Sequence, residues 1–398
     1  MIAYISKLNS EHHSPSEVCM STRRIGMSDI VIGQALPWDV YGNDGSLLLR
    51  KGFIVTQAGQ VSALVERGLF ADTGKSEGGL RDGKAAEKAS ETPSVVRTIN
   101  AVRTELRRLV YNLNTEADVQ TQLISLTKKM GAAVFMAPDV ALGCILLNQD
   151  DNYGPRHSVD TAVVSLLIAR TLKKSADEML LLAAAALTMN VAMLRQQEKL
   201  QEKSETLNAS EQELISQHPE AGVAMLRAAG VNDEDWLSWV LHHHESEDGT
   251  GYPAGKTGAD IPQNAKIISL ADRYCARVCA RSYRKSMLPN AALRDILVEG
   301  KSKIDPMLVT VFIKELGTYP IGTFVRLESG ETAVVTGKGE TTTTPYVHAL
   351  LGPRGTPLSI PLRRDTAKPL MAIREVLHRD QVSVKFTMRH LWGDIARL

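Results

Sequence analysis

The most informative segment of the sequence is HHHESEDGTGYPAG, residues 242–255. It follows an apolar segment that begins near Asp235 and has the spacing of a helix. Consecutive helical residues point about 100° apart, so His242, His243 and His244 cannot all reach one ion. We therefore expect at most two of them to be metal ligands, and a solvated histidine patch is the alternative interpretation.

The remainder of this stretch resembles a known family signature. His243-His244-Glu245, Asp248-Gly249 and Gly251-Tyr252-Pro253, in this order and spacing, resemble the motif that names the HD-GYP family of cyclic di-GMP phosphodiesterases. The resemblance extends over residues 150–335 and implies an all-α domain in which His and Asp ligands from several helices converge. Further matching positions are His157-Ser158, His218-Pro219 with Gly222 and Met225-Leu226, and Ala271-Asp272 followed by Arg281 and Tyr283-Arg284.

The chain departs from the family at an adjacent His-Asp pair and a following Lys. The resemblance places Met189, Asn190 and Met193 at these three positions, and Tyr153 where some members have an additional acidic ligand. A thioether binds hard divalent ions poorly, and an amide lacks the negative charge that holds two cations together. We therefore expect a degenerate metal site and assign no catalytic residue. Met189 and Met193 are also four residues apart, which is typical of core packing on one helix face.

Five imidazole or carboxylate side chains remain as candidate metal ligands. They are His157, His218, His243, His244 and Asp272. The resemblance implies one divalent transition metal, iron or manganese, at reduced occupancy on His218, His243 and His244, with an empty site as the alternative.

The resemblance also implies nucleotide contacts at Tyr252, Pro253, Arg281 and Arg284. Guanidinium groups on one helical face can each hold phosphate oxygens. The alternative is a solvated basic stripe, because several cationic residues cluster here: Arg273, Arg277, Arg281, Arg284 and Lys285. Cys275 and Cys279 are expected as small buried residues.

Three functions remain open from the sequence. The first is a cytoplasmic bacterial signalling protein that binds cyclic di-GMP or a partner, such as a GGDEF-type cyclase, without hydrolysis. The second is an active phosphodiesterase that produces pGpG or GMP with a sparser metal site. The third is an interaction scaffold with neither metal nor nucleotide. The family resemblance implies control of motility, biofilm or virulence as the biological output.

Composition excludes several classes of protein. The 46 Lys and Arg residues balance 45 Asp and Glu residues, which argues against nucleic acid as a partner. The 4 cysteines form neither a disulfide framework nor a CxxC zinc site. The N-terminus lacks the order of features of a secretory signal, and the apolar run from Met179 to Leu194 is shorter than the roughly 20 residues that span a bilayer. We expect a cytoplasmic protein without a membrane segment.

The 398 residues predict more than one domain. The predicted order is an irregular tail (1–24), a small α+β module (25–72), a flexible linker (73–95), a helical domain (96–316) and a β-rich extension (317–398).

Asp44-Gly45 predicts a hairpin in the module, and Thr56 is expected to cap a short helix there. In the helical domain, apolar spacing predicts helices over 96–113, 119–134, 157–172, 176–200 and 211–229. Ser175 and Asn208 are predicted to cap two of them, each with a Glu three residues later.

Alternation predicts strands around the Ser329-Gly330 turn. In the last thirty or so residues, a helix is predicted at Met371 to Ile373 and a strand at Val382 to Phe386.

Overall fold

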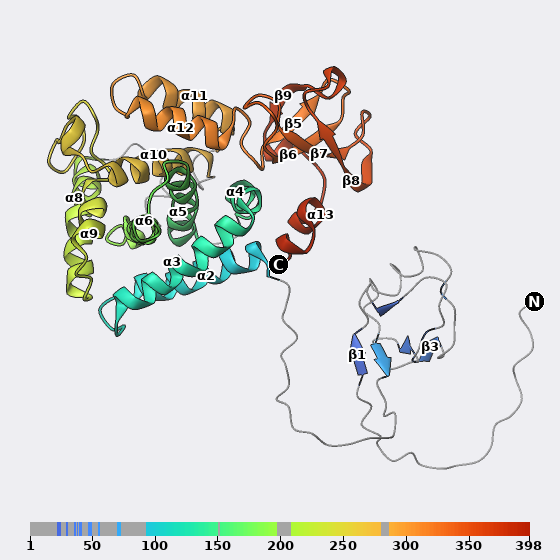
Figure 1. Ribbon diagram of the computed structural model, residues 1–398, viewed down its shortest axis with the longest axis horizontal. Coiled ribbons are helices and arrows are strands. Elements are labelled where there is room, and N and C mark those ends of the chain that lie inside the picture. The colour runs from blue at the N-terminus through green and yellow to red at the C-terminus, as the bar shows by residue number, and fades with distance from the viewer. Residues whose placement is uncertain are drawn as a thin grey trace, which may run out of the picture. The chain divides into compact units, whose positions relative to one another are not determined.

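A computed structural model of the protein describes residues 93–149, 152–196, 208–279 and 286–398, together with short pieces of the first 72 residues. The chain divides into two compact units, Met1–Ala89 and Ser90–Leu398. Figure 1 shows both along the chain.

The first unit contains a small antiparallel sheet with the strand order β1-β4-β2-β3. β2 and β3 pair antiparallel, as the predicted hairpin requires, and Asp44-Gly45 between them lies outside the described residues. A small apolar cluster is formed by Ile30, Leu36, Val40 and Val55. The helix predicted after Thr56 lies outside the described residues. The strands are β1 (Thr22–Arg24), β2 (Val40–Tyr41), β3 (Leu47–Leu49) and β4 (Phe70–Asp72).

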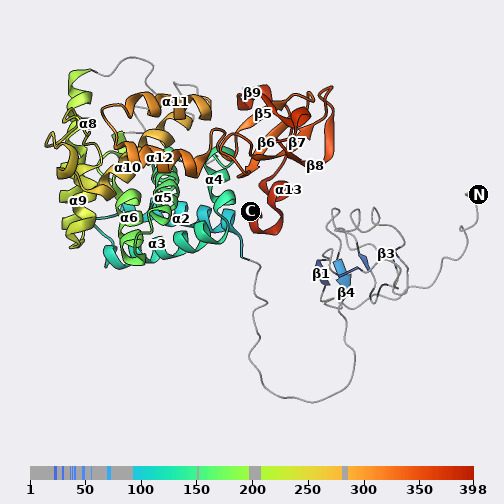
Figure 2. The same ribbon diagram turned by 45° about the horizontal axis from the view of Figure 1, so that its top comes forward.

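The second unit begins with helices packed around α5, whose residues from Tyr153 to Ala169 are all buried. α6 and α10 pack directly against α5 (Figures 1 and 2). The mainly helical fold class is therefore confirmed. The helices are α2 (Val95–Tyr111), α3 (Val119–Met136), α4 (Pro138–Leu147), α5 (Tyr153–Thr171), α6 (Ala176–Thr188), α8 (Ala209–Ala228), α9 (Glu234–His242), α10 (Gln263–Val278), α11 (Pro289–Glu299) and α12 (Pro306–Leu316).

Both predicted capping boxes are present. The Ser175 side chain accepts from the backbone of Glu178, and Asn208 does the same with Glu211. In each case the Glu side chain accepts from the backbone N–H of the cap residue, so two otherwise free donors at the helix start are satisfied.

The helix predicted over 176–200 ends earlier than expected, because α6 stops at Thr188. The chain then turns tightly: the Val191 N–H donates to the Thr188 carbonyl at 3.1 Å, and the Met193 N–H donates to the Asn190 carbonyl at 2.8 Å. These bonds span three residues, whereas α-helical bonds span four. The expectation that Met189 and Met193 share one helix face is therefore wrong. Both side chains are nevertheless buried, as core packing predicts, and Met193 also lines a cavity.

The C-terminal part of the second unit is an antiparallel sheet with the order β8-β7-β6-β5-β9. The predicted turn at Ser329-Gly330 joins β5 to β6. The strands are β5 (Phe324–Leu327), β6 (Thr332–Gly337), β7 (Tyr346–Leu351), β8 (Pro357–Asp365) and β9 (Ile373–Leu377).

Two predictions near the C-terminus are wrong. Ile373 starts strand β9, which pairs with β5, so Met371 to Ile373 is not a helix, although a short 3₁₀ turn precedes the strand. Val382 to Phe386 contains no strand. β9 already occupies the edge beside β5, and Val382 instead packs into an apolar cluster with Phe324 and Leu391. A short helix, α13 (Met388–Trp392), follows.

Within the described ranges, each helix taken alone is too short or too polar to cross a bilayer. α3 and α4 reach the required length and apolar character only as a pair, and they meet at a bend of 106°.

Candidate metal centre

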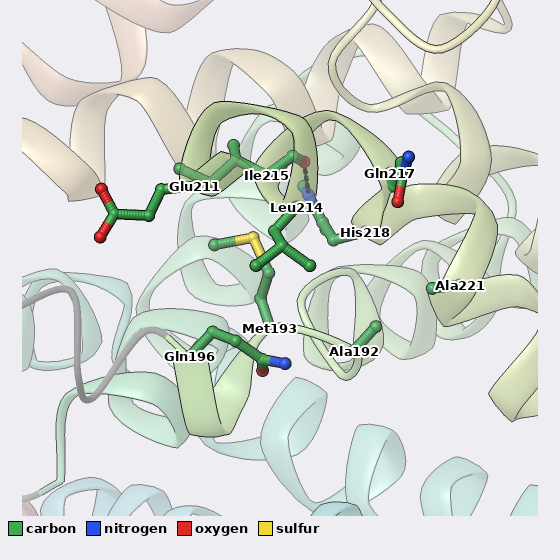
Figure 3. Close-up of a pocket in the computed structure, with 9 residues that line it drawn as sticks. All are labelled: Ala192, Met193, Gln196, Glu211, Leu214, Ile215, Gln217, His218 and Ala221. Carbon is green, nitrogen blue, oxygen red and sulfur yellow. Dashed lines mark hydrogen bonds between the residues drawn. The ribbon is translucent and has the colours of Figure 1, made fainter. Parts of the chain in front are cut away.

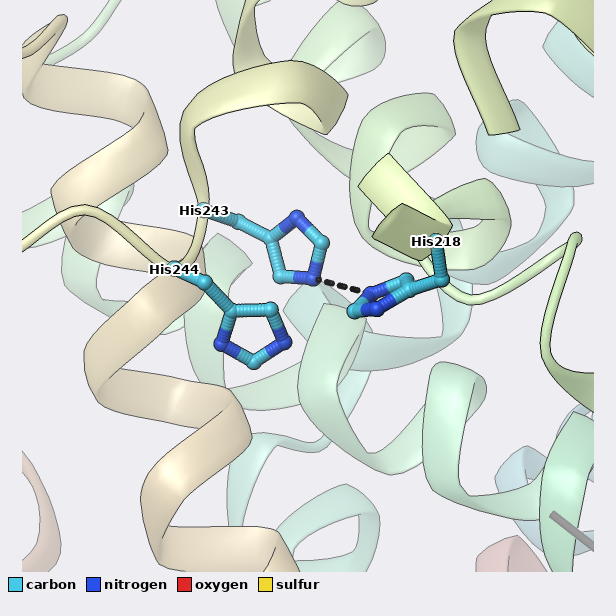
Figure 4. Close-up of side chains that lie close together, drawn as sticks. All are labelled: His218, His243 and His244. Carbon is cyan, nitrogen blue, oxygen red and sulfur yellow. Dashed lines mark hydrogen bonds between the residues drawn. The ribbon is translucent and has the colours of Figure 1, made fainter. Parts of the chain in front are cut away.

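Three histidines from two segments meet beside the C-terminal end of α9. His218 lies on α8, and His243 and His244 follow the last residue of α9 (Figure 4). One possible ligand atom from each lies within 4.8 Å of the others. His242 points elsewhere, because its Nδ1 lies 2.8 Å from the Ser238 carbonyl. Two of the three consecutive histidines therefore join the cluster, the largest number that helix geometry allows.

Burial keeps these imidazoles neutral. Burial, and secondarily the nearby His243, lowers the pKa of His218 to about 3. Burial also lowers the pKa of His243, and it lowers the pKa of His244 well below its usual value. At neutral pH all three rings are therefore in the form that binds transition metals.

Backbone carbonyls set the tautomers of two of the rings. Nδ1 of His218 lies 2.5 Å from the Ile215 carbonyl, and Nδ1 of His243 lies 2.6 Å from the Val240 carbonyl. A carbonyl only accepts, so each Nδ1 carries the proton and each Nε2 carries a lone pair. Metal-binding histidines are commonly held in this way by their second nitrogen.

The two Nε2 atoms lie 3.3 Å apart (Figure 4). Two neutral rings with lone pairs at both positions cannot form a hydrogen bond there. Two tetrahedral ligands at about 2.0–2.1 Å from one ion are separated by about 3.3 Å, so the observed spacing fits a shared cation. His244 lies 4.1 Å from His243 and 5.0 Å from His218 between ring centroids, and it offers a third ligand.

His157 and Asp272 form a separate pair. Nε2 of His157 lies 2.7 Å from Oδ1 of Asp272, and both residues are buried. Tyr153 stacks on His157 with ring centroids 5.2 Å apart and nearly parallel planes. Nδ1 of His157 is buried and has no partner among the described residues.

Asp272 supplies negative charge to the whole centre. Burial raises its pKa, but the hydrogen bond with His157 and the neighbouring imidazoles of His244 and His243 lower it more, so the pKa lies well below its usual range. Asp272 in turn favours the protonated forms of His218, His243 and His244. The carboxylate is therefore ionised at neutral pH and electrostatically coupled to all three histidines.

Comparisons with known proteins agree with this geometry. Residues 142–308, which carry all five of these side chains, match the family model described as an HD domain. These residues form an HD domain. A cyclic di-GMP phosphodiesterase of Pseudomonas aeruginosa is 30% identical to the chain over 230 residues, which is 58% of this chain and 55% of that protein.

Two other comparisons give the extent of the similarity. A cyclic di-GMP phosphodiesterase of Borreliella burgdorferi is 26% identical over 201 residues, which is 50% of this chain and 53% of that protein. A solved structure described as an HDG"Y"P protein from Bdellovibrio bacteriovorus has a TM-score of 0.49 and 14% identity, and it covers 74% of this chain and 99% of that chain. The chain spans about half the length of these two curated relatives.

Met189 and Asn190 lie at the end of α6 inside the HD domain. Both are buried. α6 packs against α5 and α9, the helices that carry His157 and lead into the histidine run. The end of α6 is anchored by Thr188, whose hydroxyl accepts from the Trp236 indole N–H at 2.8 Å. Met193 follows in the next turn and lines a cavity.

That cavity opens beside His218 and has a volume of about 350 Å³. Apolar groups from Ala192, Met193, Leu214 and Ile215 form much of its wall (Figure 3). Figure 3 also shows Glu211 at this cavity, on the same helix as His218. The HD domain therefore presents an apolar wall next to one of its candidate metal ligands.

A loop over 245–256 covers the histidine cluster. The buried carboxylate of Glu245 accepts from the backbone N–H groups of Ala254 at 2.8 Å and Lys256 at 2.9 Å. A Cβ atom at Gly251 would lie 2.4–2.5 Å from backbone atoms of residues 244–246, so only glycine fits. The sequence motif indicates this loop, but it does not reveal that the Glu245 carboxylate binds the backbone at Ala254 and Lys256.

The loop places Tyr252 on the metal centre. Its ring stacks on His244 with centroids 4.8 Å apart, and it meets His218 edge-on at 6.3 Å. Burial raises the pKa of Tyr252, so its hydroxyl stays protonated and can donate a hydrogen bond. Pro253 is partly exposed beside it, and the peptide bond between the two residues is cis.

The predicted basic stripe is only partly described. Arg281 and Arg284 lie outside the described residues. Arg273 and Arg277 both pair with Glu299 of α11, and Arg273 also donates to the Ser246 hydroxyl at 3.1 Å. For these two arginines the solvated-stripe interpretation is therefore wrong. The sequence places Arg273 only in the basic stripe and gives no local sign of its ion pair, because Glu299 is 26 positions away.

Proposed function

We propose that this protein acts in cyclic di-GMP signalling, and that its HD domain binds one divalent transition metal and a cyclic dinucleotide without efficient hydrolysis. The observation that carries the proposal is the pair of facing Nε2 atoms of His218 and His243, 3.3 Å apart, with His244 beside them. Neutral imidazoles, two of them buried and of fixed tautomer, suit iron, manganese or zinc.

The donor set supports one metal rather than two. Two-metal hydrolysis of a phosphodiester requires charged ligands that hold two cations close together. Met189 and Asn190 offer a thioether and a neutral amide instead. His157 and Asp272, the other candidate ligands, bond to each other at 2.7 Å. A metal at the three histidines would supply a Lewis acid for a phosphate oxygen.

The chain's own residues have separate roles in this proposal. Tyr252 provides an aromatic face and a hydroxyl donor at the metal centre. Glu245 and Gly251 fix the loop that carries it. Pro253, Arg281 and Arg284 are proposed to contact the dinucleotide, with the arginines holding its phosphates.

A second candidate function is an active cyclic di-GMP phosphodiesterase. It is favoured by the relative from Pseudomonas aeruginosa, which bears that name and is 30% identical. The two functions differ in the number of metals and in turnover. A GGDEF-type cyclase or another signalling protein as partner remains a proposal in either case.

The test is the metal content of the purified chain. Protein stripped with EDTA and reloaded with Mn²⁺, or with Fe²⁺ under anaerobic conditions, is expected to hold about one metal per chain and to release little pGpG from cyclic di-GMP. His244→Ala should reduce the affinity for Mn²⁺ by about 10-fold or more. His378→Ala, a histidine on the C-terminal sheet side, is the matched control and should leave affinity unchanged.

Two metals per chain with steady turnover would overturn the proposal in favour of the phosphodiesterase.

A triple variant, Met189→His, Asn190→Asp and Met193→Lys, is expected to raise the metal content above that of the natural chain. Calorimetry with cyclic di-GMP should detect binding that weakens in Tyr252→Ala and Arg284→Ala. No binding of either metal or dinucleotide would leave only an interaction scaffold.

A further inference from the structure

A cavity of about 760 Å³ lies far along the chain from the metal centre, where the segment after β9 meets the ends of α2 and α4. Its size is that of sites for nucleotide-sized ligands. Figures 1 and 2 show α13, which contributes to it, next to α4 and α2. The lining side chains that matter chemically are Asn148, Arg379, Phe386, Arg389, His390 and Arg397.

The wall of this cavity is cationic. It contains three arginines and one histidine, and among the described lining residues there is no Asp or Glu. Leu398 also lines the wall, and its backbone oxygen accepts from the Arg97 guanidinium at 3.3 Å. Arg389 is partly neutralised by Asp394 at 2.8 Å, and both of these side chains are more than half exposed. Asp150 and Asp151, which follow Gln149, lie outside the described residues. A local cationic wall stands out in a chain whose net charge is only +1.

Arg397 is held at the wall of this cavity. Its backbone carbonyl accepts from the Ser94 hydroxyl, which fixes the residue at the cavity wall. Its Nε atom is shielded from solvent and has no hydrogen-bond partner among the described residues. Because that N–H is shielded, a phosphate in the cavity would meet Arg397 through the Nη groups of its guanidinium fork, which can hold phosphate oxygens.

Aromatic surface lies on the other side of the cavity. The guanidinium of Arg379 stacks over Phe324 at 5.0 Å and over Phe386 at 5.3 Å from the ring centroids. Phe386 is only half-buried and lines the cavity. A flat guanidinium next to a partly free aromatic ring is a surface on which a planar heterocycle stacks.

We propose that this cavity is a second ligand site, separate from the metal centre, which binds a nucleoside phosphate. The phosphate groups lie against Arg389, His390 and Arg397, and the base stacks on Phe386 beside Arg379. The site rests on observations independent of the proposed function of the HD domain.

The test is calorimetric titration of the full chain with GTP, ATP and inorganic pyrophosphate in buffer containing EDTA, which removes metal from the histidine cluster. We expect at least one nucleotide to bind, and pyrophosphate to bind about 10-fold more weakly because it has no base to stack. Arg397→Met keeps the aliphatic stem and removes the charge, and should weaken nucleotide binding about 10-fold or more. Arg354→Met, an exposed arginine in the β7–β8 turn, is the control and should bind normally.

Arg389→Met and Phe386→Leu provide a second pair of variants if Arg397→Met unfolds, which thermal melting would reveal. The site is excluded if neither nucleotide binds at about 1 mM, or if binding is unchanged in the folded Arg389→Met and Phe386→Leu proteins. Equal affinity for pyrophosphate and nucleotide would contradict the stacking contact. Binding that disappears in His244→Ala would place the ligand at the metal centre instead.

Discussion

At the scale of single residues, the candidate metal centre depends on how each imidazole is held. The carbonyls of Ile215 and Val240 accept hydrogen bonds from the Nδ1–H groups of His218 and His243. The Nε2 lone pairs of the two rings therefore face a common point. Burial then keeps these rings neutral. A histidine in water would instead exchange between tautomers and titrate near neutral pH.

The same burial predicts that the metal-free protein is sensitive to acid. In the unfolded chain His218 titrates at its ordinary value of 6.5, whereas in the folded state its pKa is about 3. Below about pH 6.5 the unfolded state therefore binds a proton that the folded state refuses. The free energy of unfolding should be fully retained above that pH and should fall by up to about 1.4 kcal/mol per pH unit below it, down to about pH 3.

Urea unfolding in EDTA at about pH 7 and about pH 5 measures this dependence. His218→Gln should flatten it, since glutamine does not titrate, whereas His378→Gln should not. An equal loss of stability in wild type and His218→Gln would show that other groups dominate.

At the scale of elements, the loop over 245–256 has a tightly constrained backbone. Its two ends are joined by the Glu245 carboxylate, and Gly251 passes against the backbone of residues 244–246. These contacts fix the position of Tyr252 in the loop. The backbone N–H of Tyr252 also donates to the His244 carbonyl at 3.2 Å.

Gly251→Ala is expected to destabilise the protein by about 1–3 kcal/mol, because a methyl group there collides with backbone that cannot rotate away. It should also weaken metal binding by displacing Tyr252 from His244. Urea unfolding and Mn²⁺ titration measure the two effects. Gly131→Ala on α3 is the matched control: its nearest neighbour would be the Phe135 ring at 3.9 Å, so it should be neutral or stabilising. Full stability and metal affinity in Gly251→Ala would disprove the role given to the loop.

At the scale of the whole molecule, the second unit has its own large core. The buried cluster includes residues of α2 to α6, α9, α10 and α12 and of the C-terminal sheet. The sheet is tied to the helices through Glu315, which accepts from Lys338 at 2.8 Å and from the Thr171 hydroxyl. The helices and sheet are therefore expected to unfold together.

The predicted linker over 73–95 leads to a test by truncation. A chain of residues 90–398 should fold alone, hold the same amount of metal, and melt within about 2 °C of the full chain, a difference of less than about 1 kcal/mol. Differential scanning calorimetry and metal analysis check this. A truncated chain that melts far lower, or is recovered only as aggregate, would mean that the first unit stabilises the second.

Much of the architecture follows from local sequence. The caps at Ser175 and Asn208, the change to strands after Leu316, and the histidine run with its loop are all short-range patterns. Such patterns are reliable because caps, turns and alternation act over only a few neighbouring residues. They also limited the number of consecutive histidines that could share an ion.

Which polar groups meet depends on how distant segments of the chain pack together. The end of α6 at Thr188 depends on Trp236, 48 residues away, and the pairing of His157 with Asp272 spans 115 residues. The position of the Arg273 guanidinium likewise depends on its contact with Glu299. The strand predicted after β9 does not form, because β9 itself occupies the edge of the sheet beside β5. Contacts of this kind have no local signature, since they arise when separate helices pack and bury their polar groups together.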